Sequence, residues 1–147
     1  MLFLVHHSQA VDALIDPQRP LSDAGRLHAE QLARRAVDRG VKPDVIWHSG
    51  KLRARQTAEP LWRVCNPLAE FSAARGLQPD DPPDWIKDVV EGDARNIALV
   101  GHMPHMARLY RRLVGQQPSD AAGDFPQHGL VALEQREGHW RELWRVS

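Results

Sequence analysis

The sequence predicts an α/β fold: a mostly parallel sheet with helices on both faces and an antiparallel hairpin at one edge. Apolar runs at residues 1–5, 45–47 and 97–100 are too short for useful helices, and polar residues or glycine follow them. Such runs are typical of strands buried on both faces of an α/β sheet. Stretches with helical spacing of apolar residues separate them. We therefore expect one three-layer α/β/α sandwich domain over residues 1–147.

The first predicted helix follows a proline-containing connection at residues 10–21. Ser22 is suited to the N-cap, because its hydroxyl can accept a hydrogen bond from a free backbone N–H. Gly40 offers a stop for the helix. The apolar residues that recur at helical spacing, and that we expect to cover the sheet, are Leu27, Ala29, Leu32, Ala33, Ala36 and Val37.

The second helix should follow the strand at residues 45–47, with Ser49 as its cap and a start near Lys51. It should end near Asn66, and residues 69–73 should form a short strand or an extended connection. Free N–H groups at the start of this helix would favour an anion at the carboxyl edge of the sheet.

A third helix should start at Asp81 or Pro82, since acidic residues and proline favour the first turn. We interpret the pair Asp80 and Asp81 as an N-cap rather than as a metal or acid–base site. The residues predicted on the inner face of this helix are Trp85, Ile86, Val89 and Val90.

The C-terminal part should contain one more helix and a hairpin. Pro104 suits the first turn of a helix that follows the strand at residues 97–100 and stops at Gly115. Residues 130–133 and 140–146 are predicted to be the two strands of the hairpin, which turns at Glu137 and Gly138.

Composition narrows the class of protein. Acidic and basic residues balance at 19 each, so bulk charge indicates neither a nucleic acid nor an anionic membrane as partner. The single cysteine, Cys65, excludes an internal disulfide, fits a reducing compartment and is predicted to lie in the core. There is no run of membrane-spanning length, and no signal-peptide pattern at the amino terminus. We expect a cytoplasmic protein.

Polar side chains follow each predicted central strand, where α/β sheets bind ligands. On position alone, one of His6 and His7 could equally be a core histidine and the other a surface residue. Arg53, near the start of the second helix, can hold two phosphate oxygens with its planar guanidinium. The residues alone do not distinguish it from Arg55, which we interpret as solvated. His128, near a predicted loop end, is a weaker candidate for the same pocket.

Four blocks of the sequence form an ordered set of motifs: His6-His7-Ser8, Arg19-Pro20-Leu21-Ser22, Ser49-Gly50-Lys51-Leu52-Arg53-Ala54-Arg55-Gln56-Thr57 and Val100-Gly101-His102-Met103-Pro104. Together they resemble the histidine phosphatase superfamily and, within it, the SixA-type phosphohistidine phosphatases. The family pattern is Arg-His-Gly after a strand, Arg-Pro-Leu-Thr/Ser before a helix, Ser-Pro-x-x-Arg-Ala-x-Gln-Thr, and Val-Gly-His-x-Pro. The resemblance covers the chain to about residue 114. Histidine and serine replace the arginine and glycine of the first block.

The resemblance implies the fold of that family and phosphoryl transfer through a histidine. It implies that His7 is the nucleophile, that Arg53 and His102 hold the phosphoryl group, and that His6 replaces the missing arginine. Ser8, which replaces the glycine, is expected among the phosphate-binding residues. Gln56 and Thr57 are expected to support the helix. Possible residues at the rim of the site are Arg19, His48 and His105. No cofactor or metal is implied, and the expected partner is a phosphohistidine-bearing protein or a small phosphoester.

Three functions stay open at this point because of His6. A neutral histidine in place of a charged arginine could cost on the order of 3 kcal/mol of transition-state stabilisation. The protein could be a weakened phosphatase, or an inactive relative that binds phosphate or a phosphorylated protein. A metal site made of His6, His7, His102 and His105 is the third, although this spacing matches no structural zinc motif.

Overall fold

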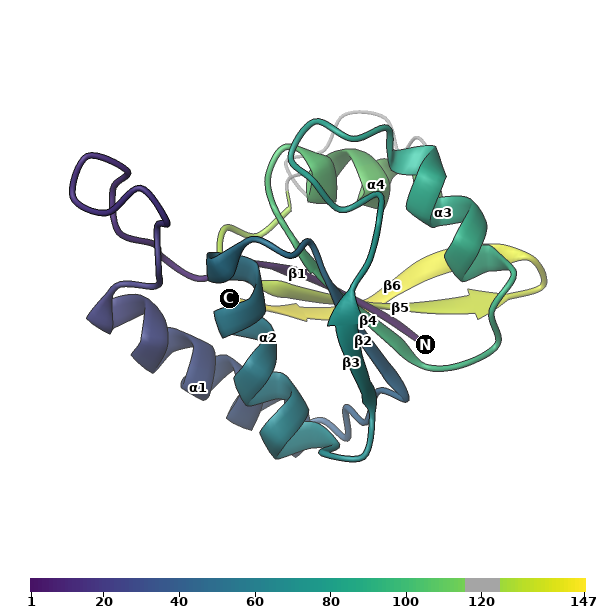
Figure 1. The fold of residues 1–147 in the computed structure, drawn as a ribbon. Coiled ribbons are helices and arrows are strands. Elements are labelled where there is room, and N and C mark those ends of the chain that lie inside the picture. Colours follow the sequence, from purple (N-terminus) through teal and green to yellow (C-terminus); the bar gives the residue numbers. More distant parts are fainter. Residues whose placement is uncertain (116–124) are drawn as a thin grey trace.

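The computed structural model describes residues 1–115 and 125–147, and within them six strands form one sheet that four helices cover (Figure 1). The elements in chain order are β1 (Leu2–His6), α1 (Asp23–Asp38), β2 (Val45–His48), α2 (Leu52–Cys65), β3 (Glu70–Ala73), α3 (Pro83–Glu91), β4 (Ile97–Gly101), α4 (His105–Val114), β5 (Leu130–Arg136) and β6 (His139–Val146).

The sheet has the strand order β3-β2-β4-β1-β5-β6. The first four of these strands run parallel to one another, whereas β5 is antiparallel to β1 and β6 is antiparallel to β5. This confirms the predicted mostly parallel sheet with an antiparallel edge hairpin. Because β1, β2 and β4 are parallel neighbours, their carboxyl ends meet at one edge of the sheet.

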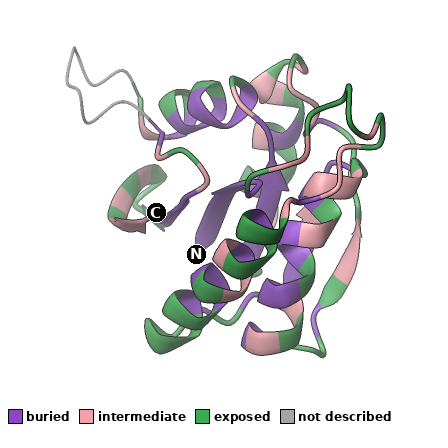
Figure 2. Cartoon of the chain, turned by 90° about the vertical axis from the view of Figure 1, so that its left-hand side faces the viewer, coloured by how far each residue is buried: buried purple, intermediate pink, exposed green. Residues whose placement is uncertain are grey.

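Two apolar clusters, one on each face of the sheet, form the core. Alternate residues of β1 serve both clusters: Leu2 and Leu4 pack with α3 and α4, and Phe3 and Val5 pack with α1 and α2. Figure 2 shows the buried central strands between the partly exposed helices. Cys65 is buried in the second cluster, as predicted. No helix of the described ranges is long and apolar enough to cross a membrane.

Helix α1 begins as predicted but buries a narrower face. The Ser22 hydroxyl accepts a hydrogen bond from the Gly25 N–H at 3.0 Å. Leu27 and Val37, predicted to face inward, are 61% and 37% exposed. The buried residues of α1 are Gly25, Ala29, Leu32, Ala33 and Ala36. Small side chains allow α1 to pack closely on α2, so the buried stripe follows the alanines.

The predicted caps of α2 and α3 are wrong. Lys51, not Ser49, is the N-cap residue of α2, and its side chain makes no cap hydrogen bond. The Ser49 hydroxyl bonds His102. Pro82 is the N-cap residue of α3, and the Asp81 carboxylate accepts the Gln78 N–H at 3.0 Å inside the preceding loop. In both cases the side chain that the sequence pattern assigned to a helix cap forms a hydrogen bond with another nearby group.

Helix α3 also buries less than predicted. Ile86 and Val90 lie in the core, but Trp85 and Val89 are 45% and 49% exposed. The short helix packs mainly on α4, so only one narrow side is covered. The C-terminal hairpin is confirmed and is longer than predicted, and it turns through positive φ angles at Glu137 and Gly138.

Candidate functional site

The carboxyl ends of β1, β2 and β4 bring the predicted site residues to one edge of the sheet. His6 ends β1 opposite Gly101, the last residue of β4, and His48 ends β2 opposite Val100. The residues that follow these strands, His7, Ser49 and His102, are all buried. The strand register therefore sets the site at the position that the sequence predicts.

His7 has the tautomer and the protonation state that a nucleophile needs. Its Nδ1 lies 2.7 Å from the Ser8 carbonyl oxygen. A carbonyl can only accept, so Nδ1 carries the hydrogen and the lone pair is on Nε2. Burial lowers the pKa of His7 to about 4, helped by the positive charge of Arg53 and opposed by the Ser8 hydrogen bond. His7 is therefore a neutral imidazole at neutral pH, with a free Nε2.

His6 is neutral as well, but presents a hydrogen instead of a lone pair. The backbone N–H of His128 donates to His6 Nδ1 at 2.8 Å, so the hydrogen of the neutral ring is on Nε2. Burial lowers the pKa of His6 to about 3, and its electrostatic interactions with His7, His128 and Arg53 lower it further. His6 thus replaces the charged arginine of the family pattern with a neutral donor.

His102 and Ser49 form the other side of the site. The His102 ring centroid is 5.0 Å from that of His7, and Ser49 Oγ lies 2.6 Å from His102 Nε2. Ser49 Oγ also accepts the Lys51 N–H at 3.3 Å. His102 Nδ1 is buried and has no hydrogen-bond partner among the described residues. Burial lowers the pKa of His102 to about 3.

Arg53 supplies the positive charge of the site. It lies in the first turn of α2, and its Nε is also buried without a hydrogen-bond partner. Burial, and then the positive charge of Arg19, lower the pKa of Arg53. The Nε–H of Arg53 and the Nδ1 of His102 are buried polar groups without a partner, which is costly unless a ligand binds there. A cation with a buried N–H donor, next to a neutral imidazole, suits a tetrahedral oxyanion.

Ser8 and Thr57 connect the end of β1 to α2. The Ser8 N–H donates to Thr57 Oγ1 at 2.9 Å, and Thr57 in turn donates to the Arg53 carbonyl at 2.8 Å. The Ser8 hydroxyl lies 3.1 Å from Nδ1 of His28. Because its N–H and hydroxyl both have partners within the chain, phosphate binding by Ser8 stays a prediction. Thr57 supports the turn that carries Arg53.

The three predicted rim residues lie in different surroundings. Arg19 has a left-handed φ of 48°, donates through Nε to the Val11 carbonyl at 3.0 Å, and lies near enough to His7 to lower its pKa. His48 Nδ1 accepts the Gly50 N–H at 3.0 Å, and its ring packs at 5.1 Å on Phe71 of β3. His105 is fully buried in the first turn of α4. Of the three, Arg19 has the best position at the rim.

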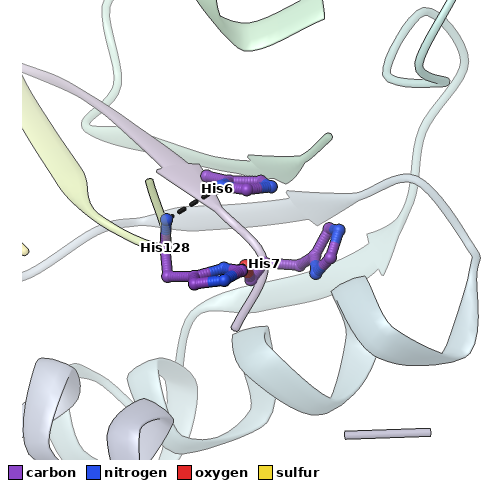
Figure 3. A group of neighbouring side chains, drawn as sticks. All are labelled: His6, His7 and His128. Carbon is purple, nitrogen blue, oxygen red and sulfur yellow. Dashed lines mark hydrogen bonds between the residues drawn. The ribbon is translucent and has the colours of Figure 1, made fainter. Parts of the chain in front are cut away.

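His128 is the functional candidate that the sequence analysis ranked too low. It lies just before β5, and its ring stacks on His6 with the centroids 4.8 Å apart and the planes 13° apart (Figure 3). Its Nδ1 lies 2.6 Å from the His7 carbonyl oxygen. One signal could have placed it: β5 is antiparallel to β1, so its amino end lies at the same edge of the sheet as the carboxyl end of β1.

The histidine cluster differs from the four-histidine metal site considered above. In the described residues, the group that could hold a metal is His6, His7 and His128, with one ring nitrogen of each within 4.8 Å of the others. A ligating histidine must offer a lone pair. His6 Nδ1 already accepts an amide hydrogen, and its Nε2 carries the ring hydrogen. Coordination by all three histidines would break that bond, so the residues do not fit a three-histidine metal site.

Comparison with known proteins agrees with the geometry. The family description "Histidine phosphatase superfamily (branch 1)" matches residues 4–78, just over half of the chain. A structure from Agrobacterium tumefaciens, assigned as the phosphohistidine phosphatase SixA, is 27% identical, with a TM-score of 0.84, and covers 99% of this chain and 96% of its own. No curated protein sequence matches the chain.

Two further structures share the fold. The protein histidine phosphatase SixA complexed with tungstate is 23% identical, with a TM-score of 0.84 over 99% of this chain and 96% of its own. A phosphoserine phosphatase variant from Entamoeba histolytica, in complex with phosphoserine, is 14% identical, with a TM-score of 0.72 over 98% of this chain and 95% of its own. The family match, and the similarity to the Agrobacterium structure over nearly the whole chain, show that this phosphatase belongs to the histidine phosphatase superfamily.

Proposed function

We propose that the protein hydrolyses phosphohistidine or a phosphomonoester through a phosphohistidine intermediate on His7. The observation that carries the proposal is the neutral His7 ring with a free Nε2, beside the unpartnered buried Nε–H of Arg53 and the unpartnered buried Nδ1 of His102. The same fold binds tungstate, a phosphate-like oxyanion, in a SixA structure. Two easier steps through a covalent intermediate would replace one difficult step.

In the first step, His7 Nε2 attacks phosphorus in line and the bond from phosphorus to the leaving group breaks. The leaving group takes a proton from solvent. The phosphorylated ring gains positive charge, which the Nδ1–H bond to the Ser8 carbonyl stabilises. Arg53, His102 and His6 donate to the phosphoryl oxygens. Water then attacks phosphorus, the P–N bond breaks, and inorganic phosphate leaves with His7 restored.

The preferred substrate is a phosphohistidine carried by a protein. Within residues 1–115 and 125–147, no carboxylate is among the groups that shift the pKa values of His6, His7 and His102. A substrate that needs a dedicated acid to protonate its leaving oxygen would therefore react slowly. The imidazole of phosphohistidine leaves more easily, since solvent can protonate it. The Agrobacterium relative carries the same phosphohistidine phosphatase assignment.

A binding role without turnover is the second candidate, and the replacement of a charged arginine by neutral His6 favours it. The missing charge could lower the rate by roughly a hundredfold and leave anion binding largely to Arg53. An inactive relative of this kind would bind phosphate or a phosphorylated protein.

Hydrolysis of a phosphohistidine peptide and of an aryl phosphate, by the natural protein and by the His7→Ala variant, separates the two candidates. An enzyme should release phosphate from at least one substrate, and His7→Ala should abolish the release. His139→Ala is a matched control, because this exposed histidine begins β6, in the edge hairpin. If orthovanadate raises the Tm while turnover stays at background, the binding role is correct. Unchanged turnover in His7→Ala would contradict the assigned nucleophile.

A further inference from the structure

We propose that His128 is a positioning residue that holds His6 as a neutral Nε2–H donor for the phosphoryl group. This inference rests on the proposed function and explains how the site works without the arginine of its relatives. It assigns a role to a residue outside the four motif blocks, and three observations carry it.

The first observation is the hydrogen bond from the His128 amide to His6 Nδ1, at 2.8 Å. A backbone amide always donates, so this bond selects the tautomer of His6 with its hydrogen on Nε2. Protonation of His6 would put a second hydrogen on Nδ1, directly against the amide N–H. The bond therefore keeps His6 neutral and leaves Nε2–H as its only donor.

The second observation is that the His128 side chain fixes the position of this amide. Its Nδ1–H donates to the His7 carbonyl at 2.6 Å, and its ring stacks on His6 (Figure 3). The next residue is held as well, because the Gly129 carbonyl accepts the His6 N–H at 3.0 Å. One residue thus contacts both histidines of the first motif block, by its amide and its ring.

The third observation is the backbone of His128, which has a left-handed φ of 53°. This region costs most residues roughly 1–2 kcal/mol, whereas asparagine and glycine adopt it readily. Asparagine also carries an N–H donor, Nδ2, at the same place along the side chain as histidine Nδ1. His128→Asn therefore keeps the hydrogen bond to His7, whereas His128→Ala loses both that bond and the ring stack.

The tautomer can be observed directly in the full chain with ¹⁵N-labelled histidine. Two-bond ¹H–¹⁵N correlation spectra near neutral pH distinguish the two ring hydrogens, and loss of a signal in His6→Gln assigns His6. The natural protein should show a single Nε2–H tautomer of His6. His128→Asn should keep it, and His128→Ala should show a mixture of tautomers.

Orthovanadate binding gives the second readout. We expect His128→Ala to weaken binding about tenfold and His128→Asn to stay within about threefold of the natural protein, as for one lost hydrogen bond. His139→Ala should leave the affinity unchanged.

An Nδ1–H tautomer or a mixture at His6 in the natural protein would overturn the inference, and so would equal losses in His128→Asn and His128→Ala. If His128→Ala does not fold, the spectra of the natural protein and of His128→Asn still test the inference. A locked tautomer with background turnover would contradict the proposed function and leave the role of His128 intact.

Discussion

At the scale of single residues, hydrogen bonds to backbone groups determine what each histidine of the site can do. Carbonyl groups accept from Nδ1 of His7 and His128, and an amide donates to Nδ1 of His6. The His7 ring therefore has its lone pair on Nε2, whereas the His6 ring has its hydrogen there. These neighbouring rings are chemically distinct, although the sequence shows three identical residues.

Substitutions at His6 can show whether the site needs a hydrogen-bond donor at the place of Nε2 or only a polar side chain. The amide nitrogen of glutamine lies at the same place along the side chain as histidine Nε2, and that of asparagine at the place of Nδ1. We expect His6→Gln to keep orthovanadate affinity and turnover within about threefold, and His6→Asn to lower both about tenfold. Calorimetry and initial rates measure the two effects. Equal losses would show that His6 does not act through Nε2.

The pKa of His7 gives a prediction on pH. Burial lowers this pKa from 6.5 to about 4. The neutral ring is the nucleophile, so its reactive form should persist well below pH 6.5 and disappear only as the pH falls through about 4. An NMR titration of the His7 ring, assigned by its loss in His7→Gln, measures the midpoint. A midpoint near 6.5 would contradict the claim that burial lowers the pKa of His7.

At the scale of elements, the sequence predicted the helices and strands of the described ranges, with β3 left open between a strand and an extended connection, but misplaced several side chains. Leu27 and Val37 fit the periodicity of α1 as well as the alanines do, yet they are exposed. Periodicity alone cannot show how closely α1 approaches α2. Ser49 was assigned to a helix cap because the pattern of neighbouring residues favours one, and its partner, His102, is distant in sequence.

Substitutions of two serines provide a matched test of whether Ser49 acts as the partner of His102 rather than as a helix cap. Ser49→Ala removes the partner of His102, so we expect turnover and orthovanadate affinity to fall about tenfold while stability changes by less than about 1 kcal/mol. Ser22→Ala removes the true cap of α1, so it should cost about 1 kcal/mol of stability and leave turnover unchanged. Urea unfolding and initial rates measure both. The reverse pattern would restore Ser49 as a helix cap.

At the scale of the whole molecule, the sheet gathers side chains from distant parts of the sequence. The family match ends at residue 78, whereas His102 and His128 lie beyond it. The sequence predicted His102 because it follows a buried strand and matches a motif block. It made His128 only a weaker candidate because no motif includes it, and because its place depends on the antiparallel pairing of β5 with β1.

The central claim is that His7 Nε2 becomes phosphorylated during turnover. Incubation with ³²P-labelled phosphohistidine peptide, followed by an alkaline quench that preserves P–N bonds, should trap label on the protein. The label should map to a peptide that contains His7, should be lost on brief acid treatment, and should be absent in His7→Gln. Steady release of phosphate with no label at His7, or with equal labelling of His7→Gln, would contradict the account.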